Sequence, residues 1–195
     1  MIKAIIFDLA EVCMKGLKGF DKTLAKLIKK DEEEIRKIIC EKSLLVNLFE
    51  KNISEEDYLN MIRDRLNLSF SNLELKELLR DHFTDDGYKE THELIKCLKL
   101  TKTPIFLLSD HAEEWIEYIL PKYDFFNLFD ELFFSFNLRK TKTSKEIFNS
   151  VLEKLGLLGE EIIFIDDSAS NLEKAKEAGI TNLILFTDIY SLRLC

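Results

Sequence analysis

The 195-residue chain has few of the residues that interrupt or cross-link a fold, with 2 prolines, 6 glycines and 3 histidines. So few chain breakers argue against a linker-rich or disordered protein. Its four cysteines are scattered along the chain and form no Cys-x-x-Cys pair. This spacing argues against a zinc cluster or a disulfide framework and favours a reducing, cytoplasmic setting. The four are Cys13, Cys40, Cys97 and Cys195.

Long hydrophobic runs and excess positive charge are also absent. No apolar run reaches the roughly 18–20 residues of a membrane span. The apolar stretch before Asp8 is too short for a secretory signal. The net charge of −8 repels nucleic-acid backbones and anionic lipids. We therefore expect a cytoplasmic protein without nucleic-acid or membrane partners, either a monomer or a homodimer.

What the chain does have is enough apolar material for a folded core. Of its residues, 46% are hydrophobic and 33% are charged. This balance is typical of a globular protein that buries a core and stays in solution. The length suits one domain, or one domain with a modest insertion.

Short apolar runs that end in polar residues predict buried parallel strands. Four such runs cover residues 4–7, 105–108, 162–165 and 183–186, and a weaker one covers residues 132–136. Helical patterns follow three of them, each opened by a pair of residues with capping-box spacing. Strands that alternate with helices in this way predict βαβ units and a parallel sheet. The three pairs are Asp110 and Glu113, Thr143 and Glu146, and Ser170 and Glu173.

Residues 15–86 differ, because they contain helical patterns and no convincing strand. Capping signals at Asp31, Ser54 and Ser71 help to predict three to five helices there. An insertion after the first strand lies over the carboxyl end of the sheet, where open α/β folds bind ligands. We therefore divide the chain into an α/β core, residues 1–14 and 87–195, and a helical cap domain, residues 15–86.

Polar residues directly after the predicted strands are the most informative feature. The carboxyl ends of parallel strands meet at one edge of the sheet, so these side chains are expected to gather there. Crowded carboxylates repel one another unless a cation neutralises them. Hard oxygen ligands with few histidines suit Mg²⁺. The residues concerned are Asp8, Ser109, Asp110, Lys142, Asp166 and Asp167.

Four segments together resemble the haloacid dehalogenase-like superfamily, and the resemblance spans most of the chain. They are residues 5–12 (IIFDLAEV), 106–110 (FLLSD), 142–148 (KTSKEIF) and 163–171 (IFIDDSASN). The helical insertion is similar to the cap of members that carry it after the first motif. The resemblance implies an α/β fold, with a three-layer Rossmann-like parallel sheet core and an inserted helical cap.

The resemblance also implies site roles. Asp8 is expected to attack phosphorus and form an aspartyl-phosphate. Ser109, Asp110 and Lys142 are expected to bind the phosphorylated substrate, and Lys142 to keep Asp8 ionised.

For the metal, the resemblance implies Mg²⁺ held by the carboxylates of Asp8, Asp166 and Asp167 and by the backbone carbonyl of Ala10. It also implies that Asn171 orients Lys142 or the start of the following helix.

One position departs from the family pattern. Phosphatases of the superfamily usually carry a second aspartate two residues after the nucleophile, as general acid and base, and here that residue is Ala10. Glu11, His111 and Glu113 are possible substitutes, although Glu11 can instead pair with the cap and His111 can sit on an exposed helical turn. Some relatives with glycine at this position are sugar-phosphate phosphatases.

Three functions stay open. The first is a Mg²⁺-dependent phosphatase for a small phosphorylated metabolite such as a sugar phosphate. The second is a binding or regulatory protein that has lost turnover, which Ala10 permits. The third is a 2-haloacid dehalogenase, which needs no metal and gives no reason for the acidic pair Asp166-Asp167.

Other residues have simpler interpretations. His82 and His92 are expected on helix surfaces, and Cys13 in the core. Lys15 or Lys18 could meet a second anionic group of the substrate, although exposure to solvent is the simpler reading. An aromatic series is expected in the core, at Phe125, Phe126, Phe129, Phe133, Phe134 and Phe136.

Overall fold

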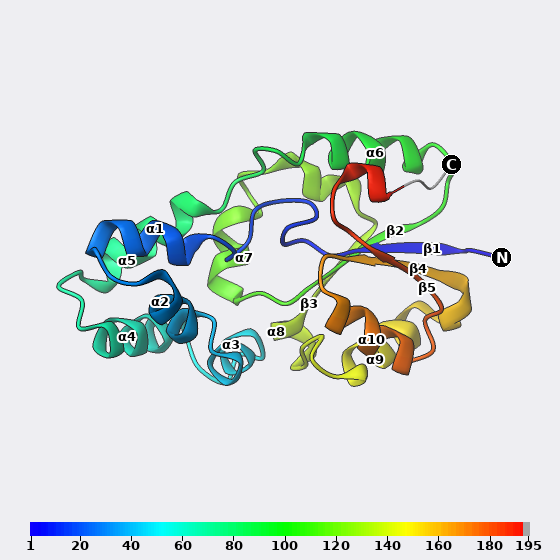
Figure 1. Cartoon of the computed structure of the whole chain (residues 1–195). Coiled ribbons are helices and arrows are strands. Elements are labelled where there is room, and N and C mark those ends of the chain that lie inside the picture. The colour runs from blue at the N-terminus through cyan, green and yellow to red at the C-terminus, as the bar shows by residue number, and fades with distance from the viewer. Residues whose placement is uncertain (193–195) are drawn as a thin grey trace.

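A computed structural model describes residues 1–192 and is built around a parallel sheet of five strands (Figure 1). The strand order is β3-β2-β1-β4-β5, and every neighbouring pair is parallel. The first strand therefore lies at the centre, between β2 and β4. The bounds are β1 Ala4–Phe7, β2 Ile105–Ser109, β3 Glu131–Phe134, β4 Ile162–Asp166 and β5 Asn182–Leu185.

All five predicted strands are present, but the two outer ones end earlier than their apolar runs. β3 ends at Phe134, which pairs with Ser109, the last residue of β2. The rest of that run begins the short helix α8, Ser135–Leu138. β5 ends at Leu185, opposite the last residue of β4. Each outer strand stops where its partner stops, because a strand needs a neighbour to satisfy its backbone groups.

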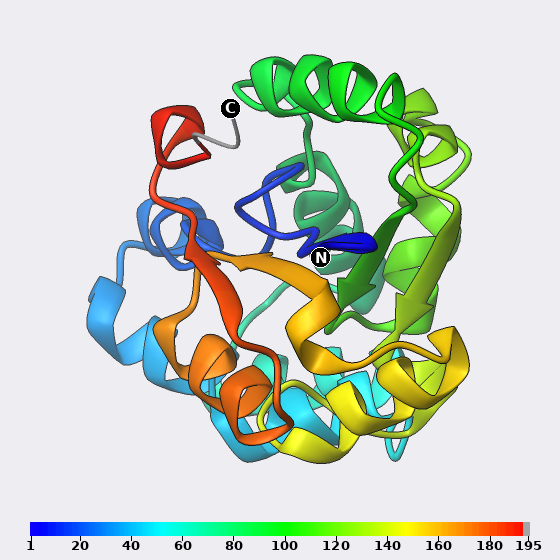
Figure 2. The ribbon, with the colours of Figure 1, turned by 90° about the vertical axis from the view of Figure 1, so that its right-hand side faces the viewer.

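Helices cover both faces of the sheet, so the core has three layers (Figure 2). Alternate residues of β1 belong to two different apolar clusters, one for each face. α6 (Lys89–Lys99) and α7 (Glu113–Ile119) pack on one face, and α9 (Lys145–Leu155) and α10 (Ala169–Glu177) pack on the other. This confirms the α/β Rossmann-like fold.

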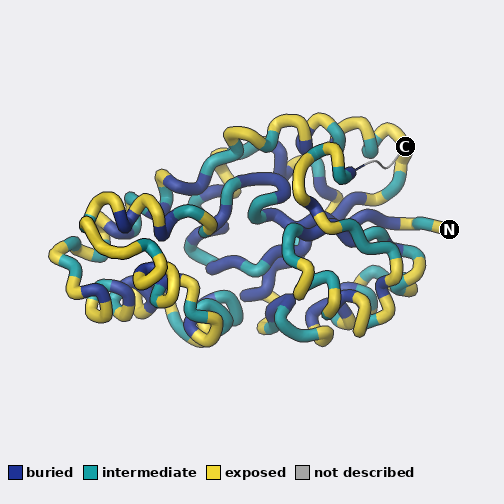
Figure 3. The backbone as a smooth tube through the Cα atoms, in the orientation of Figure 1, coloured by how far each residue is buried: buried dark blue, intermediate teal, exposed yellow. Residues whose placement is uncertain are grey.

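Five helices occupy the insertion, and they lie beyond the carboxyl ends of the strands (Figure 1). Their buried side chains join the same apolar cluster as one face of the sheet, whereas their outer surfaces are exposed (Figure 3). That residues 15–86 form a separate cap domain stays a prediction. The helices are α1 Phe20–Ile28, α2 Glu32–Ile39, α3 Lys42–Phe49, α4 Glu55–Leu66 and α5 Asn72–His82.

Capping signals in the insertion are confirmed. The side chain of Asp31 caps α2, and Ser71 with Glu74 forms a capping box at α5. The three capping pairs predicted for the core are wrong. α7, α9 and α10 begin after Ala112, Ser144 and Ser168, none of which makes a side-chain cap.

The predicted surface positions of His82 and His92 are also wrong, because both side chains are buried. Each imidazole Nε2 lies against a backbone carbonyl of the segment after β1, at 3.1 Å from Lys18 O and 2.7 Å from Cys13 O respectively. The ring of His92 also stacks on Phe125. The two histidines thus bind the segment that leads into the insertion, which helical periodicity does not reveal.

The remaining core predictions are confirmed. The six phenylalanines between residues 125 and 136 are buried, and so is Cys13. Cys13, Cys40 and Cys97 form no disulfide, and Cys195 lies outside the described residues. Among residues 1–192, no helix is long and apolar enough to cross a bilayer.

A buried carboxylate joins the insertion to the core. Glu55, at the start of α4, is 1% exposed and accepts hydrogen bonds from Trp115 Nε1 and Arg80 Nη2, both at 3.1 Å. Lys76 Nζ lies 2.9 Å from the same carboxylate. Removing one member of a buried ion network leaves the others without compensation, which is costly.

Glu55→Ala is expected to lower the free energy of unfolding by about 3 kcal/mol, because Arg80 and Lys76 then lose their shared partner. Urea unfolding measures this. Glu33→Ala is the matched control, since Glu33 pairs with Lys37 on the exposed surface of α2, and its effect should stay within about 0.5 kcal/mol. Equal losses in both variants would contradict the structural role of Glu55.

Candidate active site

One buried ammonium group lies between two buried carboxylates at the carboxyl edge of the sheet. Lys142 Nζ is 2.6 Å from Asp8 Oδ1 and 2.7 Å from Asp166 Oδ2. Lys142 is 2% exposed, Asp8 4% and Asp166 0%. Asp8 follows β1 directly and Asp166 ends β4, the neighbouring strand. The structure thus brings together three residues that are far apart in the sequence.

Asp166 is occupied by donors from the protein itself. Its Oδ1 accepts from the backbone N–H of Ser168 at 2.8 Å, and its Oδ2 accepts from Lys142. Asn171 Nδ2 donates to both oxygens, at 3.0 and 3.2 Å. Both hydrogen bonds of Asn171 go to Asp166, which itself accepts from Lys142, so Asn171 does not directly contact the lysine that the resemblance named as one of its two possible partners.

Asp167 and the second oxygen of Asp8 differ from Asp166, because no protein donor reaches either within residues 1–192. Asp8 uses Oδ1 for both the backbone N–H of Leu9 and Lys142 Nζ. One oxygen from each of Asp8, Asp166 and Asp167 lies within 4.8 Å of the others. These hard oxygen donors suit Mg²⁺, and Asp8 with Asp167 have the capacity left to bind it.

The pKa values explain why a further cation suits this site. Burial, together with Asp166 and Asp167, raises the pKa of Asp8 well above its usual range, although Lys142 opposes the change. Burial and Asp166 also raise the pKa of Asp167. Burial lowers the pKa of Lys142, but Asp166 and Asp8 raise it more, so the amine stays charged. One ammonium does not balance the carboxylates around it.

Ser109 supplies a hydroxyl group to the same edge. It ends β2, next to β1, and is fully buried. Within the described residues its Oγ has no hydrogen-bond partner. A buried polar atom without a partner costs free energy, and such an atom is expected where a ligand completes the bonding.

Asp110 does not present a free carboxylate to a substrate. Both of its oxygens accept from the backbone N–H of Lys142, at 3.0 and 2.9 Å. Burial raises the pKa of Asp110 to about 6, against the lowering effect of Lys142. In this structure, Asp110 therefore holds the backbone of the lysine.

The turn after β1 is unusually tight at Ala10. A methyl group added to Gly16 would lie 2.6 Å from Ala10 Cβ, so the two residues are packed without spare room. Glu11 takes a left-handed backbone conformation, with φ of 61°. Its carboxylate accepts from the Gly16 N–H at 3.0 Å and from the Tyr88 hydroxyl at 2.9 Å. Glu11 thus pairs with the start of the insertion, which is the alternative to a general acid and base role that the sequence left open.

The other two possible substitutes for the missing aspartate are engaged elsewhere. His111 is buried among the rings of Phe49, Phe83 and Trp115, and not on an exposed turn. Burial lowers its pKa to about 4, so the imidazole is neutral at physiological pH. The carboxylate of Glu113 forms an ion pair with Lys51.

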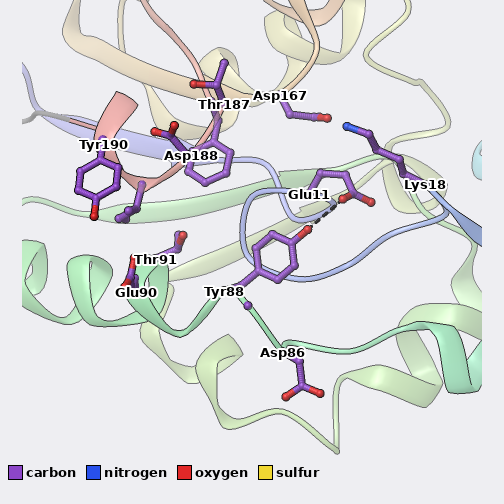
Figure 4. A pocket seen from close by; sticks show the side chains of 13 residues that line it. Glu11, Lys18, Asp86, Tyr88, Glu90, Thr91, Asp167, Thr187, Asp188 and Tyr190 are labelled. Carbon is purple, nitrogen blue, oxygen red and sulfur yellow. Dashed lines mark hydrogen bonds between the residues drawn. The ribbon is translucent and has the colours of Figure 1, made fainter.

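Two cavities flank the site. The first, of about 730 Å³, is lined by Asp167, Glu11, Lys18 and Tyr88, with the lysine pointing toward the carboxylate of Asp167 (Figure 4). Lys18 therefore faces the site, whereas Lys15 lines a different cavity beside α5. The second, of about 540 Å³, is lined by residues of α3, by Asp110, and by Thr141 and Thr143.

A family model described as haloacid dehalogenase-like hydrolase matches residues 2–179. The chain belongs to this family of hydrolases. A match over 145 residues, 72% of the chain, is 28% identical to a phosphorylated carbohydrates phosphatase from Thermotoga maritima. It spans 60% of that protein's length.

Solved structures of the haloacid dehalogenase-like family share the fold of this chain. A HAD family enzyme from Bacteroides thetaiotaomicron, solved with magnesium and inorganic phosphate, has a TM-score of 0.72 and 22% identity, with 93% of this chain and 92% of that one covered. L-2-haloacid dehalogenase from Xanthobacter autotrophicus has a TM-score of 0.70 and 16% identity, with 94% and 76% covered.

Gly16→Ala is expected to destabilise the hydrolase by about 1–3 kcal/mol, because the new methyl group meets Ala10 Cβ. In the Ala10→Gly background that contact is absent, so adding Gly16→Ala should cost much less stability there than in the wild type. Urea unfolding of the four proteins completes the cycle. An equal cost of Gly16→Ala in the wild type and in the Ala10→Gly background would show that the two methyl groups do not meet.

Asp110→Asn is expected to remove part of the pH dependence of stability. In the folded protein, Asp110 keeps its proton up to about pH 6, whereas the unfolded chain releases it near pH 4. Raising the pH across this window therefore favours unfolding of the wild type, by about 2 kcal/mol from this residue. Unfolding in EDTA at pH 4 to 7 tests this, and parallel curves for the two proteins would contradict it.

Proposed function

We propose that this hydrolase is a Mg²⁺-dependent phosphatase that transfers the phosphoryl group of a small phosphorylated metabolite to Asp8. The observation that supports the proposal best is the arrangement at the strand ends. A buried carboxylate paired with a charged lysine follows β1, and a hydroxyl group without a partner among the described residues ends the neighbouring strand β2. The oxygens of a phosphoryl group can accept from this hydroxyl and from the third N–H of the Lys142 ammonium group, whose other two partners are Asp8 and Asp166.

The chemistry follows from the side chains. One carboxylate oxygen of Asp8 attacks phosphorus, the ester P–O bond breaks, and the leaving oxygen takes a proton from solvent water, because no carboxylic acid stands at Ala10. Ser109 Oγ and Lys142 Nζ bind phosphoryl oxygens and stabilise the charge that develops on them. Water then attacks the phosphorus of the aspartyl-phosphate, which releases phosphate and restores Asp8.

Mg²⁺ fits the donors of this chain and would neutralise charge on the phosphoryl group. The groups we assign to it are the carboxylate oxygen of Asp8 that does not attack, the carboxylate of Asp167 and the carbonyl of Ala10. The carboxylate of Asp166, included in the metal set from the sequence, is better placed to hold Lys142, given its four hydrogen bonds.

The substrate class rests on the relative from Thermotoga maritima, whose name describes a phosphatase of phosphorylated carbohydrates. A sugar phosphate is the class we propose, with a cytoplasmic location and no nucleic-acid or membrane partner as further predictions. A 2-haloacid dehalogenase is disfavoured, because that reaction has no use for the cation site at Asp8 and Asp167. Ala10 leaves a binding protein without turnover as the alternative.

Hydrolysis of p-nitrophenyl phosphate tests the proposal. We expect turnover with Mg²⁺, its loss in EDTA, and a fall of at least about 10³-fold in Asp8→Asn, because the nucleophile is removed. Asp64→Asn makes the same chemical change on an exposed residue of α4 and should leave the rate unchanged. A folded wild type without turnover would favour the binding protein.

A further inference from the structure

The end of α3 is docked on the segment that leads into Lys142. Arg139 Nη1 donates to the carbonyl oxygens of Glu50 at 3.0 Å and of Lys51 at 2.8 Å. These residues directly follow the last turn of α3. The end of a helix leaves carbonyls without partners and carries partial negative charge, so a guanidinium group there is favoured. The insertion thus contacts the core three residues before Lys142.

A second contact follows two residues later. The Thr141 hydroxyl donates to the carboxylate of Glu50 at 3.2 Å and also lies 2.8 Å from the hydroxyl of Thr143. Thr141 is 1% exposed, and this bond is partly buried between α3 and the core. Thr141 and Thr143 flank Lys142 on either side.

The core holds the same segment from the opposite direction. Asp110 accepts the backbone N–H of Lys142, as described above. Arg139 adopts a left-handed backbone with φ of 54°, a conformation that residues with a side chain rarely take. Such a conformation persists where the surroundings determine it. The backbone of residues 139–142 is therefore set jointly by Asp110 and by the docked end of α3.

We propose that Arg139 and Thr141 form a latch that couples docking of the helical insertion to the position of the Lys142 ammonium group. Arg139 is a positioning residue in this scheme, and the catalytic part of the inference rests on the proposed function of Lys142. When α3 is docked, Lys142 Nζ lies between Asp8 and Asp166. When α3 leaves, the segment keeps its attachments to Asp110 and Ser150 but loses its support from the insertion, so the backbone that carries the ammonium group is held less firmly.

Lys140 provides a matched control within the same segment. Its Nζ donates to Ser150 Oγ on α9 at 2.8 Å, so this lysine contacts the core and not the insertion. Replacing Arg139 or Lys140 by methionine removes one cation and keeps an unbranched side chain. Arg139 is exposed, so its replacement leaves the apolar core intact.

Hydrogen–deuterium exchange of the whole protein, without substrate, tests the latch. Arg139→Met should speed amide exchange in α3 and residues 139–144 roughly threefold to tenfold, because the guanidinium group that binds the end of α3 is lost. Lys140→Met should leave exchange in α3 unchanged, and Arg139→Lys should restore part of the protection. The urea midpoint should be similar in all four proteins.

Turnover of p-nitrophenyl phosphate with Mg²⁺ tests the positioning. Arg139→Met should lower kcat roughly threefold to tenfold, while Lys140→Met should not. Equal exchange in the two methionine variants would overturn the latch. Faster exchange in α3 with unchanged kcat would overturn the positioning of Lys142. A wild type without turnover contradicts the phosphatase proposal, and the exchange comparison then decides the latch alone.

Discussion

The carboxyl edge of the sheet depends on one buried cation, the ammonium group of Lys142. It lies within 2.7 Å of Asp8 and of Asp166, and its pKa is raised by both. A buried ammonium group is costly unless it is paired, and so is each carboxylate. The three charges are therefore stable only together, which is why the structure holds the lysine from several sides. Asp110 binds its backbone, and Asn171 with Ser168 orients Asp166.

The pairing is incomplete, and the proposed chemistry depends on the groups that are left without partners. Within residues 1–192, one oxygen of Asp8 and the carboxylate of Asp167 accept no hydrogen bond, and Ser109 Oγ has no hydrogen-bond partner. A site that satisfied all of these groups internally would be more stable and would have no affinity for an anion and its cation. Enzymes commonly retain such unsatisfied groups where a ligand supplies the missing partner.

The insertion influences the same site through short, specific contacts. Gly16 and Glu11 fix the turn after β1, and the end of α3 meets Arg139 and Thr141 next to Lys142. A methyl group added at Gly16 would lie 2.6 Å from Ala10 Cβ, so this turn leaves no room for a side chain at position 16 opposite Ala10. The residues at positions 10 and 16 are therefore coupled through this contact.

The sequence by itself determined the parallel sheet and which strand-end residues lie at the candidate site. Apolar runs ending in Asp8, Ser109 and Asp166 define strands, and strand ends meet for topological reasons that any sequence with this pattern obeys. Only the tertiary structure decided what the polar side chains bind. His82 and His92 are buried against backbone carbonyls, Asp110 holds a backbone N–H, and Arg139 meets a helix end about 90 residues earlier in the chain. Periodicity reports which face of an element is apolar, whereas a hydrogen bond between distant segments depends on distances that exist only after the chain has folded.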